Sequence, residues 1–238
     1  MSQLAWGGTT AAGRNVISGN TSNGVVIRNN GASGNKVTGN YVGTDKNGTA
    51  ALGNSQEGIY IDGAPNNNTV GGATTAERNV ISANEYAGVA LIDGTATGNR
   101  ILSNSIFANG LLGIDLYDDG PTANDPGDAD TGPNNLQNKP VLSSSRKSAT
   151  GTTTVKGNLN STPDKTFNLQ FFSNPSGTDE GKTLLGSKSV TTNGSGNVSF
   201  TFSTQKAIRL GQNITATATN TSTGDTSEFS APRKVVAQ

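Results

Sequence analysis

Two segments of the chain, 64 positions apart, have nearly the same sequence: GRNVISGN at residues 13–20 and ERNVISAN at residues 77–84. The match extends beyond them, because residues 6–18 and residues 70–82 are identical at nine of thirteen positions. The same offset relates GNKVTGNYV to GNRILSNSI further along each copy. Similarity at one fixed interval is typical of proteins built from stacked repeats.

A shorter interval runs inside each copy, because Asn15 and Asn35 are 20 positions apart, as are Asn79 and Asn99. The apolar pieces between these asparagines are short and rich in Val and Ile, which favours strands over helices. Gly and Asn between the pieces supply the positive φ that sharp corners need. Stacked strands lie ~4.8 Å apart. We therefore expect Asn to lie above Asn, and we predict ladders of hydrogen bonds along the corners.

The sequence thus predicts an all-β protein whose first domain, residues 1–120, is a right-handed parallel β-helix of about five short coils. Residues 43–57 interrupt the repeat and are predicted to form a loop between coils. Trp6 aligns with Val70, which indicates a side chain that packs on or caps the first coil. The repeat is already under way at Trp6. We therefore expect its open end to contact further domains of a longer chain or another copy, head to tail in a filament.

The rest of the chain has a different pattern. Residues 121–142 are rich in Asp, Pro and Gly and are predicted to form an irregular joint. Residues 143–238 show strict alternation of apolar and polar residues in six or seven segments, which predicts an antiparallel β-sandwich. The apolar face of three of these segments consists of Phe167, Leu169 and Phe171; Val198, Phe200 and Phe202; and Ile214, Ala216 and Ala218.

The spellings N-V-I-S-G-N and G-V-x-I resemble the parallel β-helix repeats of large bacterial secreted and cell-surface proteins. Residues 154–175, 194–202 and 214–230 look like the immunoglobulin-like modules that often follow such repeats. This resemblance implies an extracellular or cell-surface location in a bacterium. It leaves the function open, since these repeats serve lyases, hydrolases, adhesins and structural stalks alike.

Composition narrows the chemistry that the chain can perform. It has no cysteine and no histidine, which excludes disulfides, thiolate metal sites and the commonest general base. Its formal net charge is zero without a basic block, so we expect no nucleic-acid partner. No apolar run approaches the length of a membrane span, and the first ten residues do not have the pattern of a signal peptide.

Four side chains are candidates for catalysis. Aligning the G-V-x-I-like strands on their leading glycine places Arg28, Asp62, Asp93 and Asp118 near one corner of successive coils. Carboxylates at coil spacing fall in the roughly 5–10 Å range that glycosidases use, and together with an arginine they also suit a polysaccharide lyase. The alternative is structural, because Asp before Gly is an ordinary start of a turn.

A second candidate site lies in the joint. The stretch DPGDADTGPN brings Asp125, Asp128 and Asp130 close together in sequence, with glycines that permit a tight loop. Oxygen ligands at this spacing suit calcium, although the spacing differs from an EF-hand and no glutamate closes the loop. The alternative is a turn in which the aspartates bond to the backbone and cap the last coil.

Three functions follow from these features. The first is a non-catalytic structural or adhesive module of a bacterial surface protein or filament. The second is a polysaccharide lyase or glycoside hydrolase that acts with carboxylates of the β-helix. The third is a calcium-dependent module that binds glycans.

Overall fold

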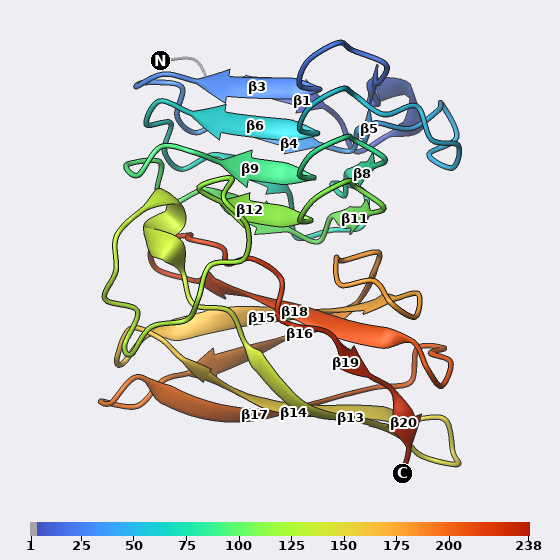
Figure 1. The fold of residues 1–238 in the computed structure, drawn as a ribbon, viewed down its shortest axis with the longest axis vertical. Helices are drawn as coiled ribbons and strands as arrows, with labels where there is room; N and C mark the ends of the chain where they lie inside the picture. The colour runs from blue at the N-terminus through green and yellow to red at the C-terminus, as the bar shows by residue number, and fades with distance from the viewer. Residues whose placement is uncertain (1–3) are drawn as a thin grey trace.

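The computed structural model describes residues 4–238, and its regular structure is almost entirely strand. The chain forms two parts that lie one on the other, a stack of parallel strands and a pair of mainly antiparallel sheets (Figure 1). Two short 3-10 turns, η1 (Ala11–Gly13) and η2 (Pro133–Leu136), are its only helical elements within these residues. The expectation of an all-β protein is therefore confirmed. In the same residues, no helix is long and apolar enough to cross a membrane.

Three parallel sheets of four strands each build the first part, and each turn of the chain adds one strand to every sheet. The first sheet holds β1 (Ala5–Gly7), β4 (Lys36–Thr38), β7 (Thr69–Gly71) and β10 (Arg100–Leu102). The second holds β2 (Val16–Ile17), β5 (Tyr41–Val42), β8 (Val80–Ser82) and β11 (Ser105–Phe107). The third holds β3 (Val25–Arg28), β6 (Ile59–Asp62), β9 (Val89–Leu91) and β12 (Ile114–Leu116). This β-helix-like arrangement is called the stack below.

The stack has four coils, so the prediction of about five was wrong. In the first sheet Ala5 pairs with Lys36 and Lys36 with Thr69, so one coil takes slightly more than 30 residues. The repeat offset of 64 therefore spans two coils. The interval of 20 residues that suggested shorter coils runs from one corner of a coil to another. Trp6 pairs with Val37 and Val37 with Val70, which confirms the predicted alignment of Trp6 with Val70.

Asparagine ladders run along all three corners of the stack, as predicted. In each ladder an asparagine donates its backbone N–H and its Nδ2 to Oδ1 of the asparagine in the next coil, except that Asn99 donates only its N–H to Asn134 of the joint and its Nδ2 to Pro65 O. Asn40, for example, bonds to Asn79 over 2.9 and 3.2 Å, and Asn79 bonds to Asn104 over 3.2 and 2.9 Å. The ladders are Asn15–Asn40–Asn79–Asn104, Asn20–Asn54–Asn84–Asn109 and Asn35–Asn68–Asn99–Asn134.

The interior of the stack is apolar, and its buried side chains come from the inward-facing positions of all three sheets. Ile59, Ile61, Ile81 and Leu91 are among those fully enclosed. Removing such side chains from water stabilises a domain by about 25 cal/mol per Å² of apolar surface. The ladders and this core together explain why the repeated sequence combines Val and Ile with flanking Asn.

Two four-stranded sheets form the second part, in the orders β17-β14-β13-β20 and β16-β15-β18-β19. Six of the strands are long: β13 (Val141–Lys147), β14 (Thr153–Asn160), β15 (Thr166–Asn174), β16 (Thr183–Thr191), β17 (Asn197–Thr204) and β18 (Asn213–Asn220). Two are short: β19 (Arg233–Lys234) and β20 (Val236–Ala237). All pairs are antiparallel except β13 with β20.

A single apolar cluster lies between these two sheets, as in a β-sandwich. Phe167, Leu169 and Phe171 are fully buried there, and Phe171 stacks on Phe202 with ring centroids 4.2 Å apart. Val198 is only partly buried. The predicted inward face of these segments is therefore confirmed.

The stack sits on the outer face of the sheet that contains β15 and β18 (Figure 1). The outward threonines of β18, Thr215, Thr217 and Thr219, are at most 3% exposed. Ile106 of β11 exchanges two backbone hydrogen bonds with Gly181 of the sandwich, at 3.0 and 2.9 Å. The last coil is thereby closed by the sandwich.

Candidate functional site

Arg28 and Asp62, two of the four catalytic candidates, meet on the outer face of the stack. They occupy the same register position on β3 and β6, and Arg28 Nε lies 3.1 Å from Asp62 Oδ2. The Arg28 guanidinium also lies over the ring of Tyr60, 5.4 Å from its centroid. Arg28 thus forms a partly exposed ion pair with the carboxylate on which the enzyme hypothesis depends.

Asp93 and Asp118 do not extend this pair, because each stands one residue beyond the column that holds Arg28 and Asp62. Asp93 accepts hydrogen bonds from Thr95 N at 2.8 Å and Thr95 Oγ1 at 2.6 Å, and these bonds lower its pKa. This is the turn geometry of the structural alternative. Asp118 is exposed and has a left-handed φ of 60°.

Two acids that the sequence alignment did not select are buried in the stack. Asp115 of β12 is only 2% exposed, and its burial and the charges of Glu228 and Asp118 raise its pKa to about 6. Glu57 is 6% exposed, and burial and the charge of Asp118 raise its pKa. A raised pKa suits a general acid, but neither side chain can reach a polysaccharide from these buried positions.

Asp125, Asp128 and Asp130 come together, since each offers an oxygen within 4.8 Å of the others. Their loop is fixed from outside: Asp128 accepts hydrogen bonds from Asn138 N at 2.7 Å and from Ser161 Oγ at 2.5 Å. Oδ1 of Asp125 and Oδ1 of Asp130 are buried without a hydrogen-bond partner among residues 4–238.

This carboxylate cluster, residues 125–130, has the oxygen chemistry that calcium prefers. Burial raises the pKa of Asp128 to about 6, and the charges of Asp125 and Asp130 add to the effect. A bound divalent cation would offset the repulsion between the carboxylates, and the two unpartnered oxygens would serve as its ligands. The side chain to backbone bonds of the structural alternative are also present, because Asp125 Oδ2 accepts a hydrogen bond from Ala129 N at 2.9 Å, but this bond lies within the joint and does not cap the last coil.

The contact between the stack and the sandwich ends two of the three ladders. Asn109 donates Nδ2 to Glu180 Oε1 of the sandwich at 2.8 Å, and Asn134 of the joint accepts from Asn99 N at 3.0 Å. Glu180 is 7% exposed, and burial raises its pKa to about 7. Asp225 Oδ1 accepts from Gly98 N at 2.6 Å. Side chains of the sandwich and the joint thus complete the hydrogen bonding of the last coil.

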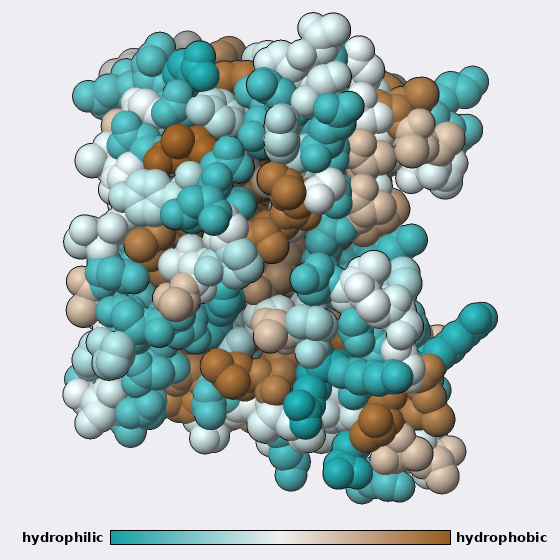
Figure 2. Space-filling model, viewed as in Figure 1, coloured by the Kyte–Doolittle hydropathy of each residue, from teal (hydrophilic) through white to brown (hydrophobic). Residues whose placement is uncertain are grey.

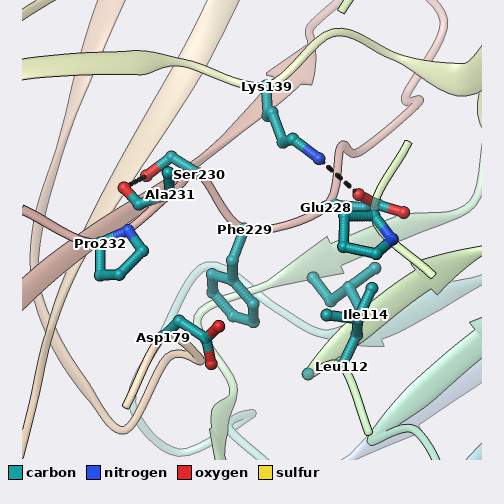
Figure 3. Close-up of a pocket in the computed structure, with 11 residues that line it drawn as sticks. Leu112, Ile114, Lys139, Asp179, Glu228, Phe229, Ser230, Ala231 and Pro232 are labelled. Atoms are coloured by element: carbon teal, nitrogen blue, oxygen red, sulfur yellow. Dashed lines mark hydrogen bonds and ion pairs between the residues drawn. The ribbon is translucent and has the colours of Figure 1, made fainter. Parts of the chain in front are cut away.

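A buried ion pair lies at the edge of the same contact. Lys139 Nζ is 2.7 Å from Glu228 Oε2, and the Glu228 side chain is 3% exposed. A largely apolar depression of about 220 Å³ opens beside them, and Phe229 points into it between Ile114 and Asp179 (Figure 3). Gly113 allows this approach, since a Cβ there would lie 2.8 Å from the Phe229 ring. The depression is small and carries no cluster of polar groups that would orient a substrate.

Sequence reasoning missed most of this contact. Glu180, Gln170 and Glu228 fall in segments that read as loop or alternating strand, and their partners lie far away in sequence. A weak signal existed for Glu228 alone, because it precedes Phe229 in a stretch with few charges, whereas Glu180 lies in the charged segment DEGK.

The fold defines a class: all-β chains in which a stack of parallel strands is closed by a pair of antiparallel sheets. A scan against protein-family models gave no match, and a search of curated proteins gave no significant match.

Proposed function

We propose that the chain is a non-catalytic structural or adhesive module of a bacterial surface protein, a right-handed parallel β-helix closed by an immunoglobulin-like sandwich. The observation that carries this proposal is the contact between the two parts. Corner ladders and strand edges of the last coil end on buried side chains of the sandwich and the joint, such as Glu180 and Asn134. A rigid spacer needs this kind of continuous connection.

The enzyme alternative has less support. Asp62 is engaged in an ion pair with Arg28, and Asp93 closes a turn. Asp115, the acid of the stack whose pKa is raised to about 6, is buried. The face of the molecule in Figure 2 is mostly hydrophilic, with apolar residues in small separate groups. The calcium-dependent glycan-binding alternative depends on the carboxylate cluster of residues 125–130 binding calcium. A structural module can contain the same cluster without binding a glycan.

Assembly of a filament by head-to-tail stacking of coils is not favoured for residues 4–238. The far end of the stack is covered by the sandwich, whose Gly181 already pairs with β11. Another copy could reach that end only if the sandwich left it.

Two experiments test the proposal. Scanning calorimetry should give one transition with equal calorimetric and van't Hoff enthalpies, because the parts share a buried contact; two separate transitions would contradict a rigid connection. Incubation with acidic and neutral polysaccharides, with and without calcium, should give no unsaturated products and no new reducing ends. Their appearance would favour the enzyme, and binding without turnover would favour the adhesive form.

A further inference from the structure

The N-terminal end of the stack, consisting of β1, β2 and β3, is its uncovered end in the described structure. Each of these strands is the last in its sheet, so one of its edges pairs with nothing among residues 4–238. Val25 and Asn29 donate backbone hydrogen bonds to the second coil. Val26 and Arg28 lie at the alternate positions of β3, so their backbone N–H and C=O groups point to the opposite, uncovered edge of the strand.

Apolar side chains gather at the same end. Leu4, Trp6, Val16 and Val26 are 45–58% exposed, and they are more than a third of the exposed large apolar side chains in the described chain. Trp6 stands in the column of Val37, which is 1% exposed one coil below. Leu4, Trp6 and Val26 line a shallow depression of about 170 Å³ together with Val37. Trp6 would be covered, as Val37 is, by one more coil.

The corner asparagines show which side of a coil fits. Inside the stack, Oδ1 of Asn40 accepts Asn15 N and Nδ2 from the coil above, at 3.1 and 2.9 Å. Oδ1 of Asn54 accepts the same groups of Asn20, at 3.2 and 2.7 Å. In the first coil, Oδ1 of Asn15 and of Asn20 has no donor among residues 4–238. The uncovered end therefore presents free Oδ1 acceptors. Inside the stack, the same acceptors receive the N–H groups of the coil above.

We propose that this end is a docking surface for a parallel β-helical coil of a partner protein, one that carries asparagines at its corners and presents their N–H groups. The proposal rests on the structural role proposed above and names the partner of that module. A second copy does not fit, because its own free end presents the same acceptors and its donor end is covered by the sandwich. The contact would repeat the coil-to-coil contact that the chain already makes three times.

The test uses the third coil of the chain, residues 68–98, as the probe, fused directly before Leu4 in place of residues 1–3. Asn99, which follows residue 98, occupies the same column as Leu4, so the added coil arrives in register. Its copies of Asn79 and Asn84 then lie above Asn15 and Asn20. A matched fusion carries Asn79→Ala and Asn84→Ala in the added copy alone.

Trp6 is the only tryptophan of the chain, so its fluorescence reports on this surface alone. We expect the fusion to shift Trp6 emission to shorter wavelength, to remove most of its quenching by acrylamide and to raise the melting temperature. The matched fusion should lose most of these changes. Unchanged quenching in the first fusion would overturn the proposal; if that fusion is insoluble, the peptide 68–98 added in excess to the unmodified chain gives the same readout.

Sedimentation of the unmodified chain over a range of concentrations tests the occupant. We expect a monomer throughout. A dimer that forms together with a Trp6 shift would overturn the assignment of a partner coil in favour of a second copy. Calorimetry reports on the contact between stack and sandwich, whereas Trp6 fluorescence reports on the docking surface. A negative result for the docking surface is therefore distinguishable from a negative result for the proposed structural role.

Discussion

Replacing Asn79 with alanine measures what a corner ladder contributes to stability. Asn79 is fully buried in the repeated N-V-I-S segment. Its Nδ2 donates to Val37 O at 2.7 Å and to Asn104 Oδ1 at 2.9 Å, and its Oδ1 accepts from Asn40 N and Nδ2. The substitution removes all four bonds and leaves the Asn40 N–H without its partner.

The expected loss follows from these contacts. A buried donor without a partner costs about 1–3 kcal/mol, and each of the other hydrogen bonds contributes about 1 kcal/mol. Together they give about 4–6 kcal/mol, a large part of the roughly 5–15 kcal/mol that holds an ordinary domain folded. Asn15→Ala is the matched control, because Asn15 belongs to the same ladder but is exposed and loses one side-chain bond. We expect it to cost below about 1 kcal/mol.

Urea unfolding of both variants and of the parent chain, followed by circular dichroism, gives the difference in free energy of unfolding. The reasoning predicts a large loss for Asn79→Ala and a small one for Asn15→Ala, with similar slopes. Equal losses would refute the ladder as a major source of stability, because the two positions differ mainly in burial and in the number of partners.

Three further predictions concern the contact between the parts and the joint. Burial raises the folded-state pKa of Glu180 from 4.5 to about 7, so the contribution of the protonated side chain to stability is lost as pH rises through that interval. In Glu180→Gln the free energy of unfolding should therefore fall less between pH 4.5 and 7 than in the parent chain, by up to about 3 kcal/mol. A pH profile identical to that of the parent would contradict this. Calcium should raise the melting temperature of the parent chain and of Asp119→Asn, an exposed position outside the cluster, but not of Asp130→Asn; no calcium effect in the parent would remove the cluster as a metal site. Lys139→Met should destabilise by about 3–5 kcal/mol because it leaves the Glu228 charge buried and unpaired, and urea unfolding should show recovery in the double variant with Glu228→Gln; additive losses would exclude the coupling.

The sequence was sufficient to predict the local rules of the stack. Repeated Asn at the corners and β-branched residues between them predicted strands, ladders and the column of Trp6 and Val70. It was not sufficient to count the coils. Coil length varies along the stack, because successive asparagines of one ladder are 25, 39 and 25 positions apart, so no single interval in the sequence marks a coil.

Of the two candidate sites, the sequence predicted the one formed by neighbouring residues and failed for the one that depended on an alignment across coils. Asp125, Asp128 and Asp130 are neighbours in sequence, and their proximity in space follows from a short loop with glycines. The corner of Arg28, Asp62, Asp93 and Asp118 depended on an alignment across coils. One extra residue between the glycine and the aspartate in the later coils moves Asp93 and Asp118 out of the column. Register along a strand is therefore the quantity that such alignments must fix before they predict a site.

The outer face of β18 shows why the contact between the parts escaped sequence analysis. Thr215, Thr217 and Thr219 alternate with buried apolar residues, a pattern that indicates a strand with one face in water. The face is covered instead: Thr215 Oγ1 bonds to Glu180 O and Thr219 Oγ1 to Thr226 Oγ1, while Thr217 Oγ1 is buried without a partner among residues 4–238. Period-two patterning distinguishes apolar from polar faces, but not a polar face in water from one in a protein contact. The same ambiguity holds at the other end of the stack, where exposed asparagines and apolar side chains have the composition of the buried coils and lack only a neighbour.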